Sequence, residues 1–493
     1  ICSPTIKSAA HLFILTSMAT ISSHIAVMTF PFSSHPSALL NLVRRLAASA
    51  PTVRFSFLST AKSNQAIFSG QQYDNIKPYD VSDGLPEGYV FTGNVHETVE
   101  AFMKATPGNF KEGMREAEAE AGVKVGCLLT DAFLAFGGEM ADAMGVPWIA
   151  FWIGGPCSLS IHIHTDPIRS TVGDTGKDVI CMKTNYRFIL LNFYIMVILV
   201  IATGMAQNAE QTLKFIPGMS KIQIRDLPEG IIDRLEMPIA HALHIMGLKL
   251  PGATAVVLNS YEEIDLTIIN DLKTKLKKVL SVGPSTLTSS SPSKLNESGC
   301  LPWLDKHKAE SVAYISFGSI LVPPPSELAA LAEAIEASGV PYLWSLPDHS
   351  RHHLPQGFVE RTSTRGMIVS WAPQLQVLAH TSVGIHITHS GWNSVLESIS
   401  YAVPMICRPF FADNMLNCRM VEDVWEIGVR VEDGILTKGG TMKALELLLF
   451  SDKGKKLKEN IRLLQESALK AVGSNGSSVK NFETLEDIIG SCC

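Results

Sequence analysis

The sequence lacks the features that mark metal-binding and nucleic-acid-binding proteins. It contains nine cysteines, but they form no CxxC pair and no Cys/His cluster with metal-ligand spacing. The formal net charge is −6, and a surplus of acidic groups argues against nucleic acid as a partner. Scattered cysteines with apolar flanks are typical of a reducing compartment. We therefore expect a cytoplasmic protein. Lipidation at Cys492 and Cys493 is a minor alternative.

The chain is also poor in charge and has no internal repeat beyond the similarity of its two halves. Charged residues make up 18% and hydrophobic residues 46% of the 493 residues, which is ample core for two to three domains. Residues 1–17 precede the first methionine, Met18, and contain an apolar patch too short for a signal-peptide core. We interpret 1–17 as non-native leader sequence, with a genuine targeting segment as the alternative.

One long apolar run interrupts this pattern. Residues 188–205 contain no charge, and eighteen such residues are long enough to span a membrane. They lie within 179–208, a segment whose composition differs from that of its flanks. We interpret 179–208 as an insertion that comes from a retained intron. A membrane span and a buried extra helix are the alternatives.

The rest of the chain alternates short apolar runs with helical patterns, which predicts parallel sheets covered by helices. The fold class is α/β, with a first domain over 18–285, a Ser-rich linker at 286–299 and a second domain over 300–472. Ser326 is the expected N-cap of a helix that Gly339 closes. The predicted strands are 24–30, 53–58, 126–130, 147–152, 255–260, 279–282, 311–317, 341–346, 367–370, 384–388 and 403–407.

The densest group of candidate site residues lies in 371–414. Two strands there flank a helical pattern at 393–401, and the loop after the first strand lies where parallel sheets bind ligands. Free N–H groups and the positive end of the helix dipole favour a phosphate at this place. His389 and Asn393 would add donors, and Glu397 would accept from sugar hydroxyls. The residues alone also allow His389 to be an ordinary structural histidine.

Two more candidates end strands in the first half of the chain. His35 follows the strand at 24–30, and Asp131 follows the strand at 126–130. Because the carboxyl ends of parallel strands share one edge, these two side chains can meet there. A histidine paired with a carboxylate is the pattern of a general base. The residues alone leave open that both are ordinary polar residues at strand ends.

The stretch 371–414 resembles the 44-residue signature box of plant family 1 glycosyltransferases, which use UDP-sugars to glycosylate small molecules. The similarity runs from about His24 to the last helix, and its closest form is the flavonoid 3-O-glucosyltransferase group. The matching residues are Trp371, Ala372, Pro373, Gln374, Leu378, His380, Gly384, Thr388, His389, Gly391, Trp392, Asn393, Ser394, Glu397, Pro404, Pro409 and Asp413.

The resemblance implies a GT-B architecture, in which two Rossmann-like domains face each other across a cleft and the C-terminal helix (473–493) returns to the first domain. Trp371 would stack on uracil, while Ala372 and Gln374 would read its edge. Glu397 would hold the ribose. The implied donor-binding residues are Ser34, Gly318, Ser319, Trp371, Ala372, Gln374, His389, Gly391, Trp392, Asn393, Ser394, Glu397, Asp413 and Asn414.

The resemblance also implies the chemistry. His35 would deprotonate the acceptor hydroxyl with Asp131 as its orienting partner, in one inverting displacement that needs no metal and no cofactor besides the UDP-sugar co-substrate. We also expect a monomer without nucleic-acid or membrane partners. The implied acceptor-binding residues are Phe30, Phe133, His162 and Phe411.

Four positions depart from the family pattern. The family usually has Cys at Ser390, Gly at Ala402, Thr at Ile153 and Gln at Asn414, and the last two positions bear on the sugar. The predicted function is transfer of glucose to a flavonol or anthocyanidin 3-hydroxyl. The alternatives are transfer of galactose or another sugar to the same acceptors, and a catalytically impaired binder of UDP-sugar or flavonoid. An epimerase or phosphorylase on the same architecture would lack this box.

Overall fold

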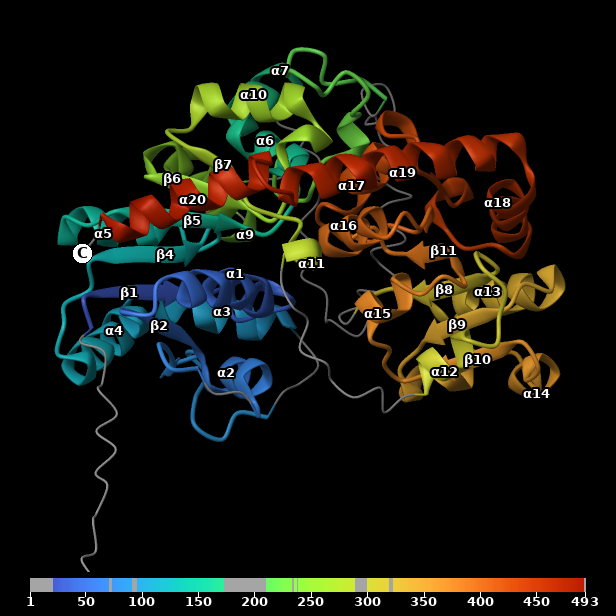
Figure 1. The fold of residues 1–493 in the computed structure, drawn as a ribbon, viewed down its shortest axis with the longest axis horizontal. Coiled ribbons are helices and arrows are strands. Elements are labelled where there is room, and N and C mark those ends of the chain that lie inside the picture. The colour runs from blue at the N-terminus through green and yellow to red at the C-terminus, as the bar shows by residue number, and fades with distance from the viewer. Residues whose placement is uncertain are drawn as a thin grey trace, which may run out of the picture.

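The computed structural model describes residues 21–70, 73–90, 95–172, 210–232, 235–236, 238–288, 299–318 and 322–491. The predicted leader (1–17), the predicted insertion (179–208), Ser319 and the pair at 492–493 lie outside these ranges. Two parallel sheets flanked by helices build the described part (Figure 1), which confirms the predicted pair of doubly wound domains. In the described ranges, no helix is both long and apolar enough to cross a membrane.

The first sheet has seven parallel strands in the order β3-β2-β1-β4-β5-β6-β7. Its first strand, β1, lies inside the sheet between β2 and β4, so the winding of the chain reverses between β1 and β4. Ile25 and Val27 of β1 belong to the core on one face, whereas Ala26 and Met28 belong to the core on the other, as a parallel sheet buried on both faces requires. The strands are β1 (Ser23–Met28), β2 (Val53–Thr60), β3 (Ile76–Val81), β4 (Cys127–Asp131), β5 (Trp148–Trp152), β6 (Ala255–Leu258) and β7 (Val279–Ser281).

Helices cover both faces of this sheet. The hydrophobic pattern of the sequence does not reveal β3, because Pro78 interrupts it. Proline cannot donate to a sheet ladder, and β3 is accordingly an edge strand. The helices and turns are α1 (His35–Ser49), α2 (Ala61–Phe68), α3 (Val95–Ala105), α4 (Gly108–Ala121), α5 (Phe136–Met144), α6 (Pro156–Ile163), α7 (Thr165–Val172), η4 (Ile224–Asp226), α9 (Pro238–Lys249), η5 (Leu250–Gly252), η6 (Glu262–Ile264), α10 (Leu266–Lys275) and α11 (Ser285–Thr288).

The second sheet repeats this plan with six parallel strands in the order β10-β9-β8-β11-β12-β13. Here the winding reverses between β8 and β11. The strands are β8 (Val312–Ser316), β9 (Tyr342–Ser345), β10 (Gly366–Val369), β11 (Val383–Thr388), β12 (Met405–Cys407) and β13 (Gly428–Arg430).

One predicted helix cap in this domain is right and one is wrong. Gly339 closes α13 with a φ of 69°, as predicted, but the N-cap is Pro324 and not Ser326, which lies inside the helix. The helices and turns are α12 (Cys300–Leu304), α13 (Pro325–Ser338), η7 (Asp348–His353), α14 (Phe358–Thr362), α15 (Gln374–Leu378), α16 (Trp392–Ser400), α17 (Asn414–Arg419), η8 (Met420–Val424), η9 (Glu432–Gly434), α18 (Lys438–Phe450) and α19 (Asp452–Val472).

The last two helices run from one sheet to the other (Figure 1). Helix α19 packs against α16, and α20 (Ser477–Gly490) packs against β7. The Ser478 hydroxyl donates to the Gly283 carbonyl at 2.6 Å, and Leu485 is buried in the core of the first sheet. The C-terminal helix therefore returns to the first domain, as the resemblance implied. The predicted linker begins within α11, and its residues 289–298 lie outside the described ranges.

Candidate active site

His35 and Asp131 meet at the switch point of the first sheet. His35 is the first residue of α1, which follows β1, and Asp131 is the last residue of the neighbouring β4. Nδ1 of His35 lies 2.6 Å from Oδ2 of Asp131, and the Phe133 N–H donates to Oδ1 at 3.0 Å. Both side chains are buried. The predicted contact is confirmed: the carboxylate fixes the imidazole and leaves Nε2 as the nitrogen that can take a proton.

Aromatic rings surround this pair. The ring centres of Phe30 and Phe133 lie 5.2 and 4.8 Å from that of His35, and 5.6 Å from each other. Trp152, at the end of β5, connects Phe133 to His162, with centres 6.0 and 5.3 Å away. Burial lowers the pKa of His162 to about 4, so its ring is neutral at physiological pH. Three of the four predicted acceptor-binding residues (Phe30, Phe133 and His162) thus belong to one wall of rings beside His35.

The second domain places its phosphate-binding candidates at the corresponding switch point. Gly318 follows β8, His389 follows β11, and Gly391 is the N-cap of α16. A Cβ on Gly391 would lie 2.4 Å from Nε2 of His389, and one on Gly318 would lie 3.0 Å from Cε1. Only glycines therefore leave room for this imidazole beside the helix N-terminus, where an anion is favoured. Burial lowers the pKa of His389 to about 4, so the neutral ring has one N–H to donate.

The candidates for the base are Trp371 and Ala372. Trp371 is 59% exposed, so it is not part of the core and has a ring face available for stacking. Ala372 is buried, so its backbone groups are what it can offer to a ligand. Both residues precede α15 in the loop after β10, at the carboxyl end of that strand.

The side chain of Gln374 belongs to a hydrogen-bonded group around Glu397. Its amide Nε2 donates to Oε2 of Glu397 at 2.6 Å and to Oγ of Ser394 at 3.1 Å. Its Oε1 accepts from the Tyr314 hydroxyl at 3.2 Å, a residue that the sequence analysis did not single out. The side chain thus orients the Glu397 carboxyl, and the contact of Gln374 with the uracil edge stays a prediction. Burial raises the pKa of Glu397 to about 7.

Asp413 and Asn414 stand at the start of α17, with Asp413 as its N-cap residue and Asn414 as its first residue. Nδ2 of Asn414 lies 3.5 Å from Oδ1 of Asp413. A Cβ on Gly154 would lie 3.4 Å from Oδ2 of Asp413, so this carboxyl faces the loop after β5 of the first domain. Burial raises its pKa. Phe411, the fourth acceptor-side candidate, lies on the same loop and is partly buried.

Contacts between the two domains bring the halves of the site together. The Asn393 amide donates to Oγ of Ser34 at 3.3 Å, beside His35. Trp392 was predicted to bind the donor, but its indole is buried, donates to the Asn259 carbonyl at 2.9 Å and packs on Gly155. The indole of Trp392 thus belongs to the domain interface, and a contact of this residue with the donor stays a prediction.

A further residue that the sequence analysis missed is Arg408, which follows β12. Its guanidinium donates to Glu327 at 2.9 Å and lies 4.0 Å from the ring centre of Phe410. It thereby holds the start of the loop that carries Asp413. An isolated arginine has no spacing signal that would have revealed this. In the described ranges, no group of three or more His, Cys, Asp or Glu could hold a metal ion, and the metal-free site stays a prediction.

Comparison with known proteins gives consistent matches over the chain. The family model of UDP-glucoronosyl and UDP-glucosyl transferase matches residues 298–469. A flavonol 3-O-glucosyltransferase from Actinidia chinensis var. chinensis is 54% identical over 473 residues, which cover 95% of this chain and 97% of that protein. An anthocyanidin 3-O-galactosyltransferase from the same plant is 50% identical over 469 residues, with coverages of 94% and 97%. The solved structure of a UDP-glucose:anthocyanidin 3-O-glucosyltransferase in complex with UDP has a TM-score of 0.85 at 40% identity, over 95% of this chain and 99% of that one.

Proposed function

Because the chain belongs to the family of UDP-glucoronosyl and UDP-glucosyl transferases, we propose that it transfers glucose from UDP-glucose to the 3-hydroxyl of a flavonol or anthocyanidin. The names of its relatives support this acceptor class. The ring wall beside His35 supports it as well, because Phe30 and Phe133 offer apolar surface to a flat aromatic molecule.

One observation carries the proposal: the histidine–carboxylate pair of one domain lies directly beside the helix N-terminus of the other. Asn393, in the first turn of α16, donates to Ser34, the neighbour of His35. A diphosphate at that helix and an acceptor hydroxyl at His35 would therefore lie on opposite sides of one sugar carbon. Holding two reactants in line is itself a large part of catalysis.

The reaction is a single displacement with inversion. Nε2 of His35 takes the proton of the acceptor hydroxyl, the acceptor oxygen forms a bond to the anomeric carbon, and the bond from that carbon to the diphosphate oxygen breaks. Negative charge then grows on the leaving UDP. The N–H groups at the start of α16 would stabilise this charge, and each donor of this type contributes about 3–4 kcal/mol.

The sugar is assigned to Asp413 and Asn414 at the start of α17. Asp413 faces the first domain at Gly154, where it can accept from sugar hydroxyls. Transfer of galactose is the second candidate, because a galactosyltransferase is among the relatives at about the same identity and Asn414 is one methylene shorter than the usual glutamine. Turnover with UDP-glucose against UDP-galactose decides between the two.

The test of the base is His35→Ala with UDP-glucose and a flavonol. We expect kcat to fall by roughly 10²- to 10⁴-fold, which is the usual contribution of a general base. UDP affinity, measured by calorimetry, should not change, because the donor site lies on the other domain. His352→Ala, at an exposed histidine of η7, is the control and should keep full turnover. Full turnover by the His35 variant would contradict the assignment.

A further inference from the structure

We propose that the loop 223–230 of the first domain positions the sugar-binding segment of the second domain, with Glu229 as the positioning residue and the Asp226–Arg419 ion pair as its anchor. This rests on the proposed function, because it takes Asp413 and Asn414 as the sugar contacts. Two of the contacts that this loop makes with the second domain bear on the sugar-binding segment. One lies just before Asp413 in the sequence, and the other lies at the end of α17, the helix that Asn414 begins.

The first contact is made by Glu229. Its Oε2 accepts the backbone N–H of Ala412 at 2.7 Å. Ala412 directly precedes Asp413 and has a φ of 53°, a left-handed conformation that a residue with a Cβ disfavours. Such a backbone persists only where the surroundings hold it, and the Glu229 carboxylate supplies a bond from across the domain boundary. The direction in which the next residue projects its side chain follows from this backbone geometry.

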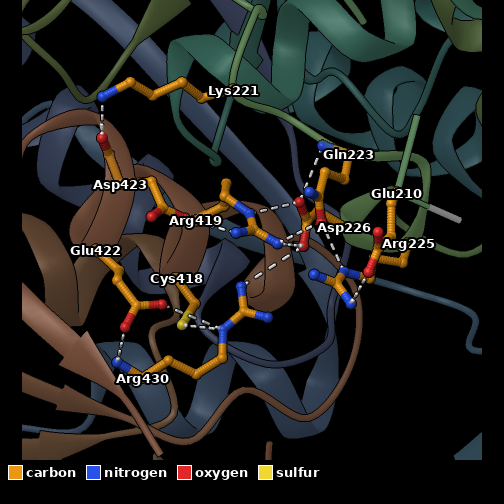
Figure 2. A network of polar contacts seen from close by, with 10 residues as sticks. All are labelled: Glu210, Lys221, Gln223, Arg225, Asp226, Cys418, Arg419, Glu422, Asp423 and Arg430. Carbon is orange, nitrogen blue, oxygen red and sulfur yellow. Dashed lines mark hydrogen bonds and ion pairs between the residues drawn. The ribbon is translucent and has the colours of Figure 1, made fainter. Parts of the chain in front are cut away.

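The second contact is a buried ion pair, shown in Figure 2. Arg419 donates from Nε to Oδ2 of Asp226 at 2.7 Å and from Nη2 to Oδ1 at 3.1 Å. Nη2 also donates to Oε1 of Gln223 at 2.9 Å, and Nη1 donates to Oδ2 of Asp423 at 2.6 Å. Asp226 is fully buried. A bidentate pair of this kind has a defined distance and direction, so it restrains the end of α17 relative to the loop.

The two contacts together hold the Ala412–Arg419 stretch from the side of the acceptor domain. The loop after β11 adds a third restraint, since the Asn417 amide donates to the Ser390 carbonyl at 3.0 Å. By contrast, Trp371 and Glu397 belong wholly to the second domain. UDP can therefore bind to that domain alone, whereas full engagement of the sugar requires the loop of the first domain to be in place.

Glu229 is exposed, so it can be changed without opening the core. In Glu229→Ala, we expect KM for UDP-glucose to rise by about 3- to 10-fold, the effect of losing one hydrogen bond, with the Kd for UDP unchanged. Glu229→Gln keeps an acceptor oxygen and should behave like the parent protein. Glu236→Ala removes another exposed glutamate close by in the sequence and should change neither value. Thermal denaturation of each variant reports on folding.

Asp413→Ala distinguishes a failure of the assigned sugar contacts from a failure of the positioning role of Glu229. If it leaves KM for UDP-glucose unchanged, the assignment of the sugar contacts fails. If it raises KM while Glu229→Ala does not, only the positioning role of Glu229 is overturned. That role is also overturned if Glu229→Ala weakens UDP binding and KM together or lowers the melting temperature, or if Glu229→Gln matches Glu229→Ala, because each of these results indicates a merely structural residue.

Discussion

Single residues decide the charge state of the donor site. Burial raises the pKa of Glu397 to about 7 from an ordinary value of 4.5, and lowers that of His389 to about 4. The imidazole is therefore neutral near pH 7, while the carboxyl keeps its proton to a higher pH than an ordinary glutamate. The Gln374 amide donates to this carboxyl at 2.6 Å, which favours its ionised form. The site is thus ready to accept hydroxyl donors once a ligand shifts the balance further.

This predicts a pH dependence of donor binding. Ribose hydroxyls donate to ionised Glu397, so UDP-glucose should bind more tightly as the pH rises through about 7, with release of a proton. Calorimetry in buffers of different ionisation heat measures both effects, and Glu397→Gln should abolish them. The raised pKa of Glu397 also makes the stability of the fold depend on pH. The folded state holds this proton more tightly than the unfolded state, so the stability that the bound proton contributes is lost as the pH rises from 4.5 through 7. An affinity that does not vary with pH would contradict the role of Glu397.

At the scale of elements, the end of α16 shows what a departure from the family pattern does. The Ala402 N–H donates to the Ile399 carbonyl at 3.1 Å, and the Val403 N–H donates to the Ser398 carbonyl at 2.9 Å. These bonds form a Schellman cap, in which the residue after the helix is left-handed. That residue is Ala402, with a φ of 54°, where the family has glycine. The helix that carries Glu397 therefore ends on a strained alanine.

Ala402→Gly should relieve this strain. We expect the free energy of unfolding to rise by about 1 kcal/mol, because a left-handed residue with a Cβ costs about 1–2 kcal/mol and glycine loses part of the gain through chain entropy. Denaturant unfolding measures the change. The control is Ala119→Gly at an exposed position inside α4, where the same substitution should lower stability by about 1 kcal/mol. A loss of stability in both variants would contradict the account.

At the scale of the whole molecule, the two sheets divide the work. The first supplies the base and the acceptor wall, and the second supplies the groups for the nucleotide. Several contacts join the two domains across their boundary, among them Ser34–Asn393, Asn259–Trp392, Asp226–Arg419 and Glu229–Ala412. The chain also returns to the first domain through α20. Activity should therefore depend on how the domains sit against each other as much as on any one side chain.

The segment 179–208 contributes none of the proposed site residues, because all of these lie elsewhere in the chain. We expect deletion of 179–208 to leave the Kd for UDP and the turnover of UDP-glucose unchanged. It should also raise the yield of monodisperse protein, because a run of eighteen uncharged residues is an aggregation hazard wherever it is exposed. Size-exclusion chromatography and steady-state kinetics of the full and deleted chains make the comparison. Loss of UDP binding on deletion would show that the segment belongs to the fold.

The sequence by itself determined the class of fold and the place of the site. Hydrophobic periodicity is a local property, so it located the strands before His35, Asp131 and His389 to within a few residues. In a parallel sheet, a residue that ends a strand must lie at the ligand-binding edge. The signature box then indicated which ligand that edge would hold. Hydrophobic periodicity did not predict β3, because Pro78 interrupts the pattern there. This edge strand is recognised only by its pairing with β2 in the folded sheet.

Only the tertiary structure decided which side chains meet. Nδ1 of His35 contacts Asp131 across 96 positions of sequence, a contact that the strand order allowed but that packing had to make. Trp392 lies within the box yet serves the interface, and Gln374 turns toward Glu397, because each side chain is placed by neighbours from distant segments. Glu229 and Asp226 carry no local signal at all. Their partners belong to the other domain, and contacts between domains depend on how two finished surfaces fit.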